Sequence, residues 1–156
     1  MAHEIERKFL VVSDAYRHGA TGILYKQGYL HDGRAPIVRV RICGEQAYLT
    51  IKGETTGITR AEFEYEIPLH DATQLLALFC KSQPVEKIRY TIAYGGATWE
   101  VDEFLGDNAG LIVAEIELAD ESDAFEHPPW LGREVSDDPR YFNVNLLTHP
   151  FKEWHS

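Results

Sequence analysis

The sequence predicts a mainly β protein with a few helices, an α+β chain built around antiparallel strands. Apolar and polar residues alternate with a period of two through most of the 156 residues, which is the pattern of strands. Short glycine-containing turns such as Gly44-Glu45 and Gly95-Gly96 separate several of these segments, which favours hairpins. No repeat, linker or low-complexity stretch is present, so we expect a single domain over residues 1–156.

The eight expected strands each have one polar or charged face. They lie near 3–12, 23–30, 36–43, 46–53, 60–68, 85–94, 97–104 and 110–118. In chain order the polar faces carry Glu4, Glu6 and Lys8; Tyr25, Gln27 and Tyr29; Arg39 and Arg41; Tyr48, Thr50 and Lys52; Arg60, Glu62, Glu64 and Glu66; Lys87 and Arg89; Glu100 and Asp102; Glu115 and Glu117. The opposite faces are mostly apolar, as in Val38, Val40 and Ile42.

Three segments depart from this alternation and predict helices. Leu75, Leu76, Leu78 and Phe79 recur at helical spacing in residues 71–81, with Asp71 as the expected N-cap. An acidic helix is expected at 119–126, ending before Pro128-Pro129. A last helix is expected at 138–148, with Pro139 in its first turn.

The composition limits the partners that this protein can have. The chain carries 25 acidic and 15 basic residues, for a formal net charge of −10, which argues against nucleic acid and anionic membranes as partners. Two cysteines form no disulfide framework, and no leader or membrane-length apolar run is visible. We therefore expect a soluble cytoplasmic protein, either monomer or homodimer.

Two architectures fit this patterning. An open sheet would pack its apolar face on the helices and show its charged face to water. A closed eight-stranded antiparallel barrel would instead turn the charged faces into its lumen. Strands carrying only Lys or Arg alternate with strands carrying Glu, which favours the barrel. Its lumen would cradle a polyanion with bases and hold hard divalent cations with carboxylates.

The order of the motifs resembles that of the CYTH superfamily, the triphosphate tunnel metalloenzymes. The matching pieces are Glu4-x-Glu6-x-Lys8, Arg39-x-Arg41, Thr50-x-Lys52, Glu62-x-Glu64, Glu86-Lys87-x-Arg89, the run Glu100 to Asp102, and Glu115-x-Glu117. The resemblance implies a charged tunnel that binds a triphosphate with Mg²⁺ or Mn²⁺, in our expectation two ions. Segments 26–30, 127–135 and 138–146 look most like the short bacterial members, which resemble inorganic triphosphatases that cleave tripolyphosphate to pyrophosphate and phosphate.

Roles for individual residues follow from the resemblance and from phosphoryl-transfer chemistry. The expected substrate-binding residues are Lys8, Arg39, Arg41, Lys52, Lys87 and Arg89. The expected metal ligands are Glu4, Glu6, Glu115 and Glu117 for a first ion, and Glu62, Glu64 and Asp102 for a second ion, for the attacking water or simply as counter-charges. The expected catalytic residues are Tyr29, Lys52 and Glu64.

Two positions leave the resemblance incomplete. Tyr29 matches a proposed general base of the short branch, but a phenol is protonated at neutral pH, so a phosphate contact is an equal alternative. Asn143 and Val144 stand where the family usually has a base, although Arg140 remains nearby.

Other functions remain open at this stage. They are a class IV-type adenylate cyclase, a thiamine or nucleoside triphosphatase of the same fold, and a non-catalytic polyphosphate-binding module.

Overall fold

The structure is a computed structural model that describes residues 2–31, 34–80 and 82–154. Its strands are β1 His3–Val11, β2 Ile23–Tyr29, β3 Ile37–Cys43, β4 Gln46–Lys52, β5 Thr59–Ile67, β6 Val85–Tyr94, β7 Ala97–Phe104, β8 Ile112–Glu117 and β9 Leu131–Glu134. The one α-helix of the described residues, α1, spans Leu69–Phe79. None of the helices in these residues is both long and apolar enough to cross a membrane.

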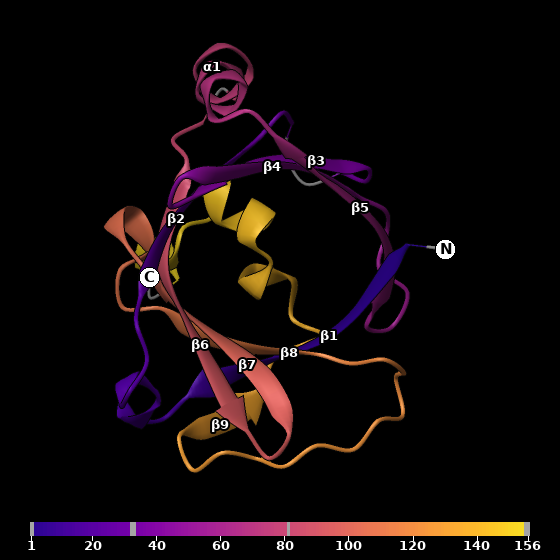
Figure 1. Ribbon diagram of the computed structural model, residues 1–156, viewed down its shortest axis with the longest axis vertical. Coiled ribbons are helices and arrows are strands. Elements are labelled where there is room, and N and C mark those ends of the chain that lie inside the picture. Colours follow the sequence, from indigo (N-terminus) through magenta and orange to yellow (C-terminus); the bar gives the residue numbers. More distant parts are fainter. Residues whose placement is uncertain (1, 32–33, 81, 155–156) are drawn as a thin grey trace.

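The first eight strands close into an antiparallel barrel, as the sequence predicts. The hydrogen-bonded order is β5-β4-β3-β2-β6-β7-β8-β1, and β1 also pairs with β5. Three residue pairs make this closing contact, among them Glu4 opposite Arg60. Figure 1 shows the strands as a ring seen nearly end-on. The open-sheet alternative is therefore excluded.

The ninth strand, β9, was not expected from the sequence. It has four residues, follows Pro128-Pro129, and pairs with the second half of β1. β5 covers only the start of that edge of β1, so the remaining edge needs another partner. The backbone bond from Val135 N–H to the Lys8 carbonyl, 2.8 Å long, continues this cover. A four-residue strand that closely follows two prolines has too little alternation to be detected.

Helix α1 begins earlier than predicted. Pro68 is its N-cap and Asp71 lies in its first turn, so the prediction of Asp71 as the cap is wrong. A carboxylate in the first turn still interacts favourably with the helix dipole. The helix packs across the outside of β2, β3 and β4. Residue 81, the predicted end, lies outside the described residues.

The prediction of an acidic helix at 119–126 is wrong. The Asp123 carboxylate accepts hydrogen bonds from the backbone of Ala119 and Asp120, and Asp120 accepts one from the backbone of Ser122. Aspartate and serine side chains that bond nearby backbone groups in this way compete with helix formation. The segment is therefore a series of turns.

The predicted helix at 138–148 forms as two 3-10 helices, η3 Pro139–Tyr141 and η4 Asn143–Leu147. Phe142 is extended between them. The break lets Tyr141 pack in one apolar cluster and Val144 in another with Tyr29 and Ile37. Figure 1 shows this C-terminal part of the chain, in yellow, inside the ring of strands.

Much of the apolar core lies outside the barrel wall, because the wall turns its charged face inward, whereas the clusters around Tyr141 and Val144 pack with the C-terminal segment inside the ring. Phe9, Trp99, Ile116 and Trp130 are buried together on the outer surface beside Tyr16. Coverage is less complete on another side, where Phe63 is 42% and Tyr65 57% exposed. The wall thus leaves an interior lined by polar side chains, and this interior is the candidate site.

Candidate active site

A cavity of about 210 Å³ occupies the barrel interior. Its walls are formed by Glu4, Glu6, Lys8, Tyr29, Ile37, Arg39, Arg41, Lys52, Arg60, Glu62, Glu64, Lys87, Arg89, Glu100, Glu115, Glu117, Phe142, Asn143 and Val144. Every residue predicted for the site lies on this wall except Asp102. The strand alternation therefore brings together side chains from distant parts of the chain.

Carboxylates gather where β1, β8 and β7 adjoin. Glu6 lies directly opposite Glu117 across β1 and β8, and Glu115 lies opposite Glu100 across β8 and β7. Burial, and then the charge of Glu115, raise the pKa of Glu6 above its ordinary value. Burial and the charges of Glu4 and Glu6 likewise raise the pKa of Glu117. Burial would raise the pKa of Glu115, but the charges of Lys8 and Arg89 hold it well below its ordinary value. We call Glu6, Glu100, Glu115 and Glu117 the carboxylate cluster; Glu6 and Glu117 in it disfavour their own negative charge, which a bound cation would relieve.

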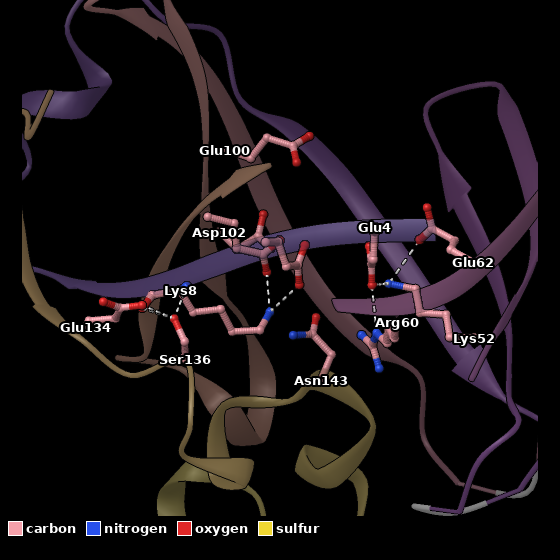
Figure 2. A network of polar contacts seen from close by, with 12 residues as sticks. Glu4, Lys8, Lys52, Arg60, Glu62, Glu100, Asp102, Glu134, Ser136 and Asn143 are labelled. Carbon is pink, nitrogen blue, oxygen red and sulfur yellow. Dashed lines mark hydrogen bonds and ion pairs between the residues drawn. The ribbon is translucent and has the colours of Figure 1, made fainter. Parts of the chain in front are cut away.

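Two lysines form ion pairs with carboxylates of the lumen, Lys8 with members of the carboxylate cluster and Lys52 with carboxylates outside it. Nζ of Lys8 lies 2.7 Å from Glu115 and 3.2 Å from Glu6. Nζ of Lys52 lies 2.9 Å from Glu4 and 3.2 Å from Glu62. Figure 2 shows the amino group of Lys52 between Glu4 and Glu62.

Glu4 differs from its neighbours because cations surround it. Nε of Arg60 donates to Glu4 at 2.7 Å, and Lys52 contacts the same oxygen. Burial alone would raise the pKa of Glu4, but the charges of Lys52 and Arg60 lower it to about 2. Burial raises the pKa of Glu62 to about 6. The charge of Lys52 lowers this pKa, and the charge of Glu4 raises it.

Arginines gather on β3 and β6, and Arg89 also reaches the carboxylate cluster, 3.1 Å from Glu100 and 3.9 Å from Glu115. The guanidinium carbons of Arg41 and Arg89 lie 5.0 and 4.8 Å from the centre of the Tyr25 ring, within cation–π range. Burial and the charges of Arg39 and Arg89 lower the pKa of Arg41 to about 10. We call Arg39, Arg41 and Arg89 the arginine cluster; Arg41 in it disfavours its own positive charge, which a bound anion would relieve.

Asp102 lies behind the wall as a counter-charge. Its carboxylate accepts two hydrogen bonds from Arg89, at 2.7 and 2.8 Å, and contacts Nζ of Lys87 at 2.7 Å. Burial would raise the pKa of Asp102, but Arg89 and Lys87 lower it to about 2. Burial lowers the pKa of Lys87 to about 7 despite the attraction of Asp102. These contacts occupy the carboxylate oxygens that a metal ion would need.

Several wall residues had no role assigned from the sequence. Arg60 and Glu100 share the predicted lumen phase, which was the signal that could have identified them. Asn143 comes from η4 and accepts a 2.7 Å hydrogen bond from Nζ of Lys87, a contact across 56 residues of sequence that no local pattern reveals. Arg140 pairs with Asp138 at 2.8 Å, and its side chain is 46% exposed, so it is not on the cavity wall.

The comparisons with known proteins agree with this geometry. The model of the CYTH domain matches residues 2–148. This chain belongs to the CYTH family. A protein of Acetivibrio thermocellus named inorganic triphosphatase is 51% identical over 154 residues, which are 99% of each chain. One of Nitrosomonas europaea with the same name is 38% identical over 151 residues, covering 92% of this chain and 95% of its own.

A solved structure shares the whole CYTH fold. The crystal structure of an inorganic triphosphatase is 33% identical, with a TM-score of 0.68, and the match covers 94% of this chain and 95% of that one. The resemblance read from the sequence motifs is confirmed by these matches.

The donor chemistry of this CYTH site fits a hard divalent cation. The carboxylate cluster supplies the oxygen ligands that Mg²⁺ and Mn²⁺ prefer, and a cation would relieve the repulsion that raises the pKa values of Glu6 and Glu117. Among residues 2–31, 34–80 and 82–154, no three carboxylate, imidazole or thiol groups already converge as a metal-binding group. Several of these carboxylates are instead engaged by Lys8, Lys52 and Arg60.

Proposed function

We propose that this CYTH protein is a metal-dependent inorganic triphosphatase, which hydrolyses tripolyphosphate to pyrophosphate and phosphate. The observation that carries the proposal is the pairing of an arginine cluster with a carboxylate cluster across one cavity. The arginine cluster would bind an anion and the carboxylate cluster a cation, and a metal-bound polyphosphate contains both. The names of the two relatives support this choice of substrate.

The cationic side chains would neutralise and align the phosphate chain. Arg39, Arg41 and Arg89 can each fork onto phosphate oxygens, whereas Lys8, Lys52 and Lys87 act as point charges. Water attacks the terminal phosphorus, the bond to the bridging oxygen breaks, and pyrophosphate leaves with the bonding electron pair. Positive side chains around the cavity stabilise the charge that develops on the leaving oxygen.

We assign the first metal ion to Glu4, Glu6, Glu115 and Glu117, and a second to Glu62 and Glu64. When bound, Mg²⁺ or Mn²⁺ supplies charge neutralisation to the phosphate oxygens. Asp102 is better assigned to hold Arg89 and Lys87 in place, because its oxygens are already occupied. Lys52 lies 3.2 Å from Glu62 and 2.9 Å from Glu4, so it links the two ligand groups.

Glu62 and Glu64 also orient the attacking water in this proposal and receive its proton. Burial raises the pKa of Glu62 to about 6, which is close to the optimum for a general base at neutral pH. Glu64 accepts a 2.8 Å hydrogen bond from Thr50 and contacts Arg39 at 3.2 Å. These contacts fix its carboxylate beside the arginine cluster.

The test compares phosphate release from tripolyphosphate, ATP and thiamine triphosphate, each with Mg²⁺, Mn²⁺ or EDTA. We expect fast release from tripolyphosphate that EDTA abolishes. Turnover of only an organic triphosphate would move the assignment to a nucleoside or thiamine triphosphatase, and cyclic AMP formed from ATP would identify a cyclase. Tight tripolyphosphate binding without any turnover would indicate a binding module.

Two free cysteines in the described residues, Cys43 and Cys80, support the expectation of a reducing, cytoplasmic environment. Size-exclusion chromatography with light scattering would decide between the proposed monomer and homodimer.

A further inference from the structure

A fully buried glutamine links the arginine cluster to the C-terminal part of the cavity wall. Gln27 lies on β2 and has an exposed fraction of 0%. Nε of Arg41 donates to its Oε1 at 3.0 Å. Its Nε2 donates to the Tyr29 hydroxyl oxygen at 2.6 Å and to Oδ1 of Asn143 at 3.2 Å. Lys87 donates to that same Oδ1 at 2.7 Å.

The cations at the two ends of this network fix the direction of every hydrogen bond. Nε of Arg41 can only donate, so the Gln27 atom facing it must be the carbonyl oxygen. The Gln27 amide nitrogen therefore faces Tyr29 and Asn143, and an amide nitrogen donates but does not accept. The Lys87 ammonium independently requires the carbonyl oxygen of Asn143 on its side.

Two hydrogen-bond donors are thereby left for the lumen. The Tyr29 hydroxyl oxygen accepts from Gln27, so its own hydrogen must point in another direction. Oδ1 of Asn143 is occupied by Gln27 and Lys87, so its amide nitrogen is free to face elsewhere. Both residues line the cavity, where phosphate oxygens are the acceptors in the proposed reaction.

We propose that Gln27 is a positioning residue, which directs the Tyr29 hydroxyl and the Asn143 amide into the cavity as neutral donors to phosphate oxygens. This inference rests on the proposed function. Tyr29 then acts as a hydrogen-bond donor, and the water proton is taken by another group. Gln27 itself touches no substrate in this proposal, since its three side-chain hydrogen bonds are all with neighbouring side chains.

The test reverses the direction of one hydrogen bond. In Gln27→Glu, a carboxylate still accepts from Arg41 but cannot donate, so Tyr29 turns its hydrogen away from the lumen. We expect kcat/KM for tripolyphosphate to fall about tenfold, as for the loss of one hydrogen bond to a charged group. Tyr29→Phe should cost about the same. Gln74→Glu, the same substitution on the exposed side of α1, is the control for the added charge.

The double variant decides between positioning and general damage. The comparison is made in an Asn143→Ala chain, so that Tyr29 is the one proposed donor left for Gln27 to direct. If Gln27 acts through Tyr29, adding Gln27→Glu to Tyr29→Phe in that chain causes little further loss. Two losses that multiply, to about a hundredfold, would overturn the proposal, and so would wild-type activity in Gln27→Glu. Gln27→Met, neutral and of similar length, carries the same comparison if Gln27→Glu does not fold, as judged by thermal melting.

The pH profile gives a second decision. A donor role predicts that Tyr29→Phe lowers kcat/KM without removing the acid limb of its pH dependence. If Tyr29→Phe no longer shows the rise of kcat/KM with pH at the acid side, Tyr29 is the general base and the proposal is overturned. If the wild type does not hydrolyse tripolyphosphate, the proposed function fails by itself. The same double-variant comparison is then made from the Kd of tripolyphosphate in EDTA by calorimetry, with the same tenfold expectation.

Discussion

Glu4 and Glu6 show how the register of a barrel decides what a carboxylate can do. Both lie on the lumen face of β1, two residues apart. Glu4 lies opposite Arg60 on β5, whereas Glu6 lies opposite Glu117 on β8. Like charges directly opposite one another destabilise a sheet. The Glu6–Glu117 pair therefore destabilises the fold at the place where the carboxylates would bind a cation.

Glu6→Gln should separate these two effects. We expect Mg²⁺-dependent phosphate release to fall at least about a hundredfold, because a metal ligand is lost. The melting temperature in EDTA should stay level or rise, because the repulsion with Glu117 is removed and Lys8 keeps Glu115 at 2.7 Å. Glu45→Gln, an exposed turn position, is the matched control. A variant that retains wild-type turnover would refute the assignment of Glu6 to the metal.

The identity of the lumen residues was predictable, but their partners were not. Alternation along a strand has a period of two, so the phase of one charged residue predicts the face of all the others. Whether a carboxylate meets a base or another carboxylate depends on register between strands, which the alternation does not contain. Asp102 illustrates this: its phase is right, yet Lys87 and Arg89 hold it behind the wall.

Helix α1 and its C-cap approach the backbone of β2 closely at Gly28. A Cβ atom built at Gly28 would lie 2.6 Å from Cδ2 of Leu76 and 3.0 Å from Sγ of Cys80. Such distances are too short for carbon contacts, so the helix can lie on this strand only because Gly28 has no side chain. Gly28 also separates Gln27 from Tyr29, which point to the lumen.

Gly28→Ala is expected to displace α1 or bend β2. Overpacking of this kind costs about 1–3 kcal/mol, so the melting temperature should fall by several degrees. Differential scanning calorimetry measures this loss. Gly53→Ala is the matched control, because its added Cβ would lie 3.5 Å from Cβ of Ala61, an ordinary contact. Equal melting temperatures for the two variants would contradict the packing argument.

Elements with a strong local period were predicted well, and elements held by tertiary contacts were not. The eight barrel strands repeat a two-residue pattern over six to ten residues each. β9 has four residues and exists because β1 has an open edge. The C-terminal helix divides at Phe142 because its apolar residues must reach two separate clusters, which the sequence pattern alone does not indicate.

The whole molecule reverses the usual arrangement of a small barrel. Ion pairs stabilise the charged part of its interior, and many of its apolar residues pack outside the wall, some of them beneath α1. Two further apolar clusters pack with the C-terminal segment inside the ring. Removing one member of a buried ion pair leaves an uncompensated charge, which is strongly destabilising. The barrel should therefore respond as a unit to ions that enter its interior.

Divalent metal should stabilise the protein more at pH 8 than at pH 5. Burial raises the pKa of Glu62 to about 6 and raises those of Glu6 and Glu117 above their ordinary values. Below these folded-state pKa values the carboxylates bind protons, which a metal must displace. The rise in melting temperature on adding Mg²⁺ or Mn²⁺ should therefore shrink as the pH falls through about 6. Na⁺ at matched ionic strength is the control, and an equal rise at both pH values would contradict this expectation.

The closing contacts of β1 also have a consequence for how the protein is made. Lys8 bonds to Glu115 across 107 residues of sequence, and the cavity wall between them includes residues from every intervening strand. Contacts so distant along the chain form slowly, because a large loop must close first. During synthesis, β1 therefore cannot form its pairing with β8 until β8 has emerged from the ribosome. A nascent chain that stops short of β8 carries its full arginine cluster but lacks Glu115 and Glu117, so its carboxylate cluster is incomplete.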